Sequence, residues 1–202
     1  MKLYYLKGAC SLASNIALRE AGVPFELVQV ERGTKRAEGV DFNTINSKGY
    51  VPTLKLDDGE VLTENVAVLQ YIGDRNPAAK LVPAAGTLER YRLQEWLAFI
   101  NSEIHKRFSP IFAPDAKEDA KTFAREHLAK RLKWLNDALG NKKFLMGEQF
   151  TVADAYLFTV LTWAPIVHVD LAPFPALRSF AERVAARPHV KEAMKAEGLI
   201  KG

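Results

Sequence analysis

The N-terminal part of the chain alternates short apolar runs with an amphipathic stretch. Residues 2–6, KLYYL, and residues 25–30, FELVQV, combine aromatic and aliphatic side chains in the way that is typical of strands. Between them, apolar residues recur at helical spacing over 11–21, and Gly22 predicts the end of that helix. Strand, helix and strand in this order predict a βαβ unit with parallel strands.

A hairpin pattern follows after a polar connection. Residues 53–58 and 61–63 are expected to form two strands that flank the turn DDGE. A short helical segment is expected near 41–46, and residues 64–75 have helical periodicity that stops before an Asn-Pro pair. The first 75 residues therefore predict βαβ, a connection and then ββα.

Strand signals disappear after NPAAKLVPAAG, whose prolines and small residues indicate a linker. Beyond it the apolar residues recur at helical spacing, and TVADAYLFTVLTWAPIV is apolar nearly all round, which predicts a central buried helix. The expected helices cover residues 88–108, 116–139, 151–167 and 174–198, the last as one or two closing helices. The predicted domains are an α/β domain at 1–75, a linker at 76–86 and an all-helical domain at 87–202.

The composition is ordinary for a globular protein. Of 202 residues, 48% are hydrophobic and 26% charged, and no apolar stretch approaches the ~18 residues of a membrane span. The net charge of +4 comes without a block of basic residues, which argues against nucleic-acid binding and suits small anionic substrates. A lone cysteine cannot form an internal disulfide, and the first apolar run is too short for a signal peptide. We therefore expect a cytoplasmic protein without membrane or nucleic-acid partners.

The single cysteine, Cys10 in KGACSLASN, lies between the first predicted strand and the first predicted helix. A thiol at the first turn of a helix faces unpaired backbone N–H groups and the positive end of the helix dipole, which both stabilise a thiolate. The alternative is a small buried hydrophobic residue, the usual state of a lone cysteine. Small Ala9 and polar Ser11 beside it argue against deep apolar burial, and both explanations stay open at this point.

The order strand, cysteine, helix resembles thioredoxin-like folds. The run CSLA at 10–13 lacks the second cysteine of a C-x-x-C motif, so the thiol can pair only with a thiol from outside the chain. In KGYVPTL, Pro52 precedes the third predicted strand. A trans proline would only mark the strand start, whereas a cis proline, as in thioredoxin-like folds, lets the backbone of Val51 pair with a bound peptide.

Glu64 and Asn65 of LTEN fall at the start of the next predicted helix. A helix cap or a first-turn acid explains this position in isolation. The functional alternative is an anion site at the helix N-terminus, with Glu64 holding an ammonium group beside it.

Together these features resemble glutathione transferases, over essentially the whole chain. The bacterial beta class is the nearest match, with K-L-Y-Y-x-x-G-A-C-S-L-A-S at the start, V-P-x-L before the third strand and T-E-x-V-A at the next helix. EWLAFINSEIHK (95–106) and FTVADAY (150–156) match its motifs in the helical part. The resemblance implies a glutathione transferase fold: a thioredoxin-like α/β domain that binds glutathione, followed by an all-α helical-bundle domain that binds electrophiles.

The resemblance also implies roles at the thiol. Cys10 would lie beside the glutathione sulfur and could hold it as a mixed disulfide. Ser11 and His105 would help to activate the thiol, His105 from the helical domain as a hydrogen-bond partner or base. In isolation, a solvated or core-edge histidine is the usual explanation for His105, which lies at the border of an apolar stripe. The other histidines share no close spacing with it, so no metal site is expected.

Glutathione binding would use a second group of residues. The backbone of Val51, before a cis Pro52, would pair with the cysteinyl unit. Glu64 and Asn65 would hold the γ-glutamyl end, with Asn65 standing where the family usually has Ser or Gly. Lys35 would meet the glycine carboxylate.

Two features of the helical part need separate explanations. Ala98 stands where the class often has an Asn that reaches the partner subunit's glutathione, so this contact is expected to be missing although a homodimer is still expected. Thr151 and Asp154 are expected to form a capping box for the central helix. Four aromatic residues line an electrophile pocket or belong to the core: Phe108, Phe112, Tyr156 and Trp163.

The expected reaction is conjugation of glutathione thiolate to small hydrophobic electrophiles, with thiol–disulfide exchange or dehalogenation through Cys10 as further chemistry. The alternative is a non-catalytic binding or regulatory protein of the same fold, because function depends on the site and not on the scaffold.

Overall fold

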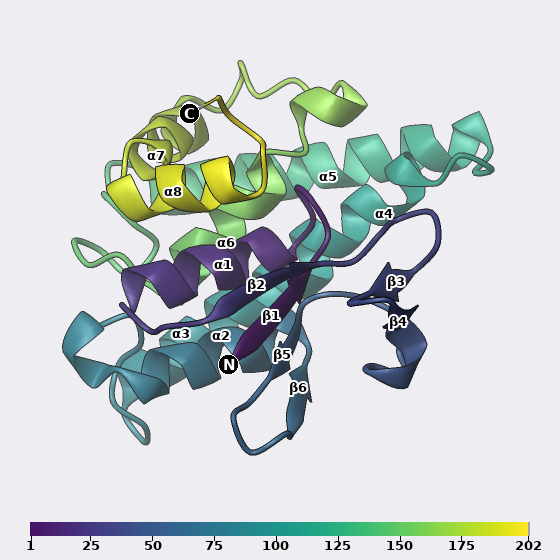
Figure 1. Ribbon diagram of the computed structural model, residues 1–202. Helices are drawn as coiled ribbons and strands as arrows, with labels where there is room; N and C mark the ends of the chain where they lie inside the picture. Colours follow the sequence, from purple (N-terminus) through teal and green to yellow (C-terminus); the bar gives the residue numbers. More distant parts are fainter. Residues whose placement is uncertain (202) are drawn as a thin grey trace. The chain divides into compact units, whose positions relative to one another are not determined.

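The computed structural model describes residues 1–201 (Figure 1). Its contacts divide the chain into two compact units. The first unit holds residues 1–82 and the described residues from 186 onward, and the second holds residues 83–185. No helix within the described 1–201 is both long and apolar enough to cross a membrane.

A four-stranded sheet with the order β2-β1-β5-β6 forms the base of the first unit. In chain order this unit contains β1 (Lys2–Tyr5), α1 (Ser11–Glu20), β2 (Glu26–Gln29), β3 (Arg36–Ala37), β4 (Val40–Asp41), η1 (Phe42–Thr44), β5 (Thr53–Lys55), β6 (Val61–Thr63), α2 (Asn65–Arg75), η2 (Pro77–Ala79) and α8 (Pro188–Ala196). β1 runs parallel to β2 and antiparallel to β5, and β5 pairs with β6 as a hairpin. The predicted βαβ unit and hairpin are both confirmed.

The helix α1 is buried on nearly every side, because it packs against α2 and α8 as well as the sheet (Figure 1). Its apolar residues, such as Leu12 and Ile16, are fully buried. Gly22 has φ +65° and ends the helix, with its N–H bonded to Arg19 O at 3.0 Å. This is the left-handed position that glycine adopts at little cost, as the sequence predicted.

The second unit is helical. It contains α3 (Leu88–Phe99), a π-helical turn η3 (Ile100–His105), α4 (Lys106–Phe112), α5 (Glu118–Leu139), α6 (Val152–Leu161), η4 (Pro165–Val167) and α7 (Pro175–Ala185). Every residue of α6 is buried, which confirms the predicted central helix. The capping box is present: Asp154 accepts hydrogen bonds from Thr151 N at 2.8 Å and Thr151 Oγ1 at 2.9 Å.

Several boundaries differ from the predicted ones. The central helix ends at Leu161 and only a short 3₁₀ turn follows, so the apolar run to 167 is not one helix. The ribbon of β3 and β4 has two residues in each strand, too few to leave a periodic signal. The helix α8 groups with the first unit because it packs on α1, whereas the prediction placed it with the helical domain. The predicted domain limits of 1–75 and 87–202 themselves stay a prediction.

Candidate active site around Cys10

The turn between β1 and α1 places Cys10 at the helix N-terminus. Gly8 has φ +68°, and Ala9 N bonds to Leu6 O at 3.0 Å, which turns the chain after β1. Cys10 is the N-cap of α1, and its carbonyl accepts the N–H of Ala13 at 3.1 Å. Its side chain is half-buried, so the thiol is neither a core residue nor a fully solvated one.

The Cys10 thiol lies against the segment that precedes β5. Its Sγ donates to the backbone carbonyl of Val51 at 3.2 Å. The Val51–Pro52 peptide bond is cis, as the family resemblance implied, and both residues are buried. Two of the predicted site positions, 41 residues apart in the chain, are thus in direct contact.

Ser11 is fully buried, and its hydroxyl faces the end of β1. The Leu6 N–H donates to Ser11 Oγ at 3.3 Å, and Ser11 Oγ donates to Leu6 O at 3.4 Å. These bonds tie the first turn of α1 to the residue that follows β1. Ser11 therefore fixes the turn that carries Cys10, and its role at the thiol stays a prediction.

A small pocket of about 180 Å³ adjoins Val51. Its charged walls are the exposed cations Arg32 and Lys35 and the exposed carboxylate of Glu31, and apolar side chains such as Phe42 close it. Lys35 has φ +53°, in the left-handed region, and its N–H bonds to Glu31 O at 2.8 Å. The predicted residues Lys35 and Val51 thus share one pocket, and Arg32 is a second cation that the sequence analysis did not single out.

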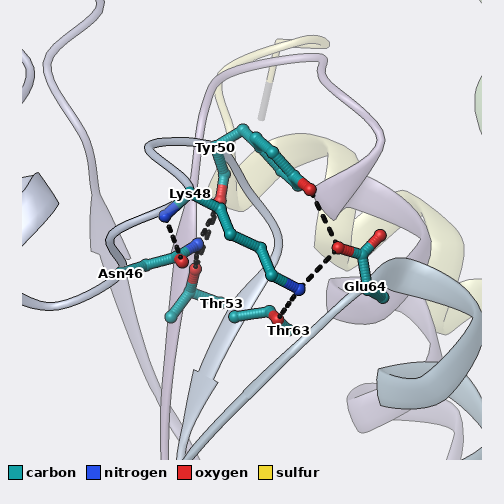
Figure 2. Close-up of polar contacts among 6 residues, drawn as sticks. All are labelled: Asn46, Lys48, Tyr50, Thr53, Thr63 and Glu64. Carbon is teal, nitrogen blue, oxygen red and sulfur yellow. Dashed lines mark hydrogen bonds and ion pairs between the residues drawn. The ribbon is translucent and has the colours of Figure 1, made fainter.

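Glu64 stands at the N-terminus of α2 and accepts hydrogen bonds from Lys48 and Tyr50 (Figure 2). Its Oε1 receives Lys48 Nζ at 2.8 Å and Tyr50 Oη at 2.8 Å. Lys48 Nζ also donates to Thr63 Oγ1 at 2.9 Å. The bond to Glu64 raises the pKa of both Lys48 and Tyr50. The predicted ammonium-binding carboxylate therefore already has a cation and a phenol beside it.

The loop that carries Lys48 and Tyr50 is held by Asn46, which is buried (Figure 2). Asn46 Nδ2 donates to Tyr50 O at 2.8 Å and to Thr53 Oγ1 at 2.9 Å. Asn46 Oδ1 accepts the Lys48 N–H at 3.0 Å. No periodicity or local motif marked Lys48 and Tyr50, because their partner Glu64 lies 16 and 14 residues further along the chain.

Asn65 is buried, and its side chain is directed at α1. Its Oδ1 accepts the hydroxyl of Ser14 at 2.9 Å, whereas its Nδ2 has no partner among the described residues. The side chain is thus used between α2 and α1. As the first residue of α2, Asn65 also has a backbone N–H with no acceptor inside the helix.

His105 belongs to the second unit and is enclosed there by other aromatic residues. Burial lowers the pKa of His105 to about 4, with a further contribution from the charge of Lys106, so the imidazole is neutral at pH 7. Its Nδ1 lies 2.6 Å from Tyr156 Oη, which donates its proton to Asn101 Oδ1 at 3.0 Å. Nδ1 must then carry the ring proton, and Nε2 is left as the acceptor.

The aromatic residues predicted as pocket or core gather around His105. The Trp163 ring lies 4.9 Å from the His105 ring, 5.5 Å from Phe108 and 5.8 Å from Phe112. Phe108 and Tyr156 are fully buried, whereas Phe112 is 42% exposed. The aromatic cluster is therefore part of the core at Phe108 and Tyr156 and reaches the surface at Phe112. In residues 1–201 no three His, Cys, Asp or Glu side chains are grouped as a metal site.

Comparisons with known proteins cover both units. Residues 9–75 match the domain family described as glutathione S-transferase, N-terminal domain, and residues 99–188 match glutathione S-transferase, C-terminal domain. The chain is 48% identical to the glutathione S-transferase GstA of Escherichia coli O157:H7, over 98% of this chain and all of that protein.

Solved structures give the same result. A sphingomonad glutathione S-transferase complexed with glutathione is 49% identical with a TM-score of 0.96, over 99% of this chain and 100% of that one. A bacterial beta-class glutathione S-transferase of Sphingomonas chungbukensis is 48% identical, also with a TM-score of 0.96 and the same coverage. The resemblance seen in the motifs is confirmed.

Proposed function

Because the chain belongs to the glutathione S-transferase family, we propose that it is an enzyme that joins the thiolate of glutathione to small hydrophobic electrophiles. The observation that carries this proposal is the contact of Cys10 Sγ with the Val51 carbonyl at the N-terminus of α1. It brings a half-buried thiol, a helix N-terminus and a buried backbone carbonyl to one place, next to a pocket lined by two cations and one carboxylate. The helix N-terminus and the cations suit an anionic ligand, the carbonyl suits an amide donor, and the half-buried thiol can meet a second thiol.

The charges at this face complement those of glutathione, which has two carboxylates and one ammonium group. Lys35, with Arg32 in the same pocket, supports binding of the glycine carboxylate. The backbone of Val51 serves the cysteinyl unit, and Glu64 serves the ammonium group. The side chain of Asn65 bonds to Ser14, so the γ-glutamyl carboxylate receives its backbone N–H at the α2 N-terminus.

In the proposed conjugation the glutathione sulfur attacks an electrophilic carbon and displaces a halide or adds to an activated double bond. The sulfur must first lose its proton, and the α1 N-terminus favours the thiolate. His105 keeps the role that the family resemblance implies for it at the thiol, and its imidazole is neutral at pH 7. With a pKa of about 4 the imidazole does not keep the proton at pH 7, so the proton passes to solvent.

A second reaction rests on Cys10 itself. A Cys10 thiolate attacks one sulfur of glutathione disulfide, the disulfide bond breaks, and one glutathione thiolate leaves while a mixed disulfide forms. The chain has one cysteine, so this mixed disulfide can be resolved only by an external thiol.

We expect Cys10→Ala to abolish the mixed disulfide with glutathione and to leave conjugation of a nitroaromatic halide partly active. Intact mass after incubation with glutathione disulfide measures the first, and initial rates with glutathione and the halide measure the second. Ser109→Ala, at an exposed position in the second unit, is the control. If the wild-type chain forms no mixed disulfide and Cys10→Ala conjugates at the full rate, Cys10 has no part in the chemistry. If the wild-type chain neither binds glutathione-agarose nor turns over, the chain is a binding or regulatory protein.

The enzyme is further proposed to be a cytoplasmic homodimer. Leu88 and Tyr91 at the start of α3 are 65% and 60% exposed, which supports a partner surface on the second unit. Ala98 is also exposed on α3, and it offers no hydrogen bond to a partner's glutathione. Light scattering of the purified chain measures its molar mass in solution, and the mass of a monomer would contradict the proposed dimer.

A further inference from the structure

The end of the C-terminal helix reaches the turn that precedes Cys10. Glu197, the residue that follows α8, is 3% exposed. Its Oε2 accepts the backbone N–H of Gly8 at 3.0 Å, and its Oε1 accepts Asn15 Nδ2 of α1 at 3.1 Å. One carboxylate thus bonds to the chain two residues before the thiol and to the helix that the thiol begins.

The chain packs closely around this carboxylate. Gly198 has φ +66°, and Leu199 N bonds back to Met194 O at 2.8 Å, so the helix end turns toward residues 7 and 8. A Cβ added at Gly8 would lie 3.3 Å from the Leu199 side chain. A Cβ added at Gly198 would lie 3.3 Å from Lys7 Nζ. The turn before Cys10 therefore packs directly against the residues that follow Glu197.

We propose that Glu197 is a positioning residue for Cys10: its carboxylate holds the Gly8–Cys10 turn so that the thiol stays at the α1 N-terminus and against Val51. The importance of this contact for catalysis rests on the proposed function. The contact itself lies entirely within the first unit. No pattern in the sequence marked Glu197, because 189 residues separate it from Gly8.

The hydrogen-bond partners favour an ionised carboxylate at this position. Both Gly8 N–H and Asn15 Nδ2 are donors, so a proton on Glu197 would face a donor and weaken one of the bonds. Burial nevertheless raises the pKa of Glu197 to about 7, although Asn15, Gly8 and the charge of Arg19 lower it. The other ionisable groups facing this end of α8 are Tyr5 of β1 and Lys7 of the turn.

Two measurements test the proposal, and neither uses glutathione. The first is the Gly8 amide signal in a ¹⁵N–¹H spectrum, followed with pH. In the wild-type chain we expect it to shift with one midpoint near the Glu197 pKa of about 7. In Glu197→Gln this titration should be lost. In the matched control Glu192→Gln, an exposed carboxylate on the same helix, it should remain.

The second measurement is the rate at which iodoacetamide alkylates Cys10, the single thiol, at a fixed pH of about 8. We expect Glu197→Gln to slow alkylation by about threefold or more. A released turn no longer keeps the thiol where the helix dipole favours its thiolate. Glu197→Asp keeps the charge but shortens the side chain, and it should slow alkylation in the same direction.

The outcomes separate the possibilities. A Gly8 titration that persists in Glu197→Gln, or unchanged alkylation in both Glu197 variants, overturns the proposal. Faster alkylation in Glu197→Gln alone shows that the carboxylate acts through its charge and not through position, which also overturns it. If the Gln variant does not fold, as circular dichroism reports, the Asp variant carries the alkylation measurement, and an unchanged rate in it overturns the proposal. A wild-type chain without glutathione turnover contradicts the proposed function and leaves these measurements valid.

Discussion

At the scale of single residues, the site is built from side chains that are held by distant partners. Cys10 contacts Val51, and Glu64 contacts Lys48 and Tyr50. The motifs identified Cys10, Val51 and Glu64, because their types and local positions have a chemical meaning. They did not identify Lys48 and Tyr50, because an ordinary lysine and tyrosine in a loop acquire a role only when the fold brings them to Glu64.

The carboxylate of Glu64 is the most specific test of ligand binding at this scale. If it holds the ammonium group of glutathione, Glu64→Gln removes one charge-assisted hydrogen bond. We expect the KM for glutathione to rise about tenfold, equivalent to about 1.4 kcal/mol, with a smaller change in kcat. Glu60→Gln, an exposed change in the hairpin turn, serves as the control.

Initial rates over a range of glutathione concentrations give both constants. An unchanged KM in Glu64→Gln would show that Lys48 and Tyr50 keep this carboxylate occupied, and that the ammonium group binds elsewhere.

At the scale of elements, hydrophobic periodicity and stop signals predicted most helices and strands. Gly22 ends α1 and Gly140 follows α5. Both glycines have a positive φ, which explains why glycine at these positions is a helix stop signal. The π-helical turn at Ile100–His105 was not predicted, since it continues the same apolar stripe as α3 and α4. The packing of α8 on α1 had no signal in the sequence, because an amphipathic pattern shows that a helix face is buried but not which surface buries it.

The capping box of α6 is the element whose loss should matter most for stability. Asp154 is fully buried and accepts the N–H groups of Leu145 at 2.8 Å and Thr151 at 2.8 Å. Asp154→Ala leaves these donors without partners, and we expect a loss of about 2 kcal/mol or more in the free energy of unfolding. Urea unfolding measures it, with exposed Asp137→Ala as the control. An unchanged unfolding curve with lost activity would place Asp154 in the site instead.

At the scale of the whole molecule, three buried ionisable groups set the pH dependence of stability. Burial raises the pKa of Asp154 to about 6 and that of Glu197 to about 7, above their ordinary values of 3.8 and 4.5. The folded chain therefore binds more protons than the unfolded chain in these windows, and stability falls as pH rises through them. His105, with its pKa lowered to about 4 from 6.5, acts in the opposite direction and favours folding as pH rises.

The two carboxyl groups lower the free energy of unfolding as pH rises, and the single imidazole raises it. The sum is a net fall in the free energy of unfolding between about pH 5 and pH 7. We expect Glu197→Gln to flatten this fall by about 1 kcal/mol or more, because it removes the group with the highest of the three pKa values. Urea unfolding of both chains over this range measures the slope. A wild-type free energy of unfolding that rises steadily from pH 5 to pH 7 would contradict the expected ionisation of Glu197 and Asp154.

The central claim is that glutathione binds at the face formed by Cys10, Val51 and Glu64. A crystal structure of the chain soaked with glutathione tests it most directly. The account predicts the glutathione sulfur in contact with Cys10 Sγ, its cysteinyl backbone paired with Val51 and its ammonium group on Glu64. Electron density for glutathione elsewhere, or none at a concentration that supports turnover, would contradict it.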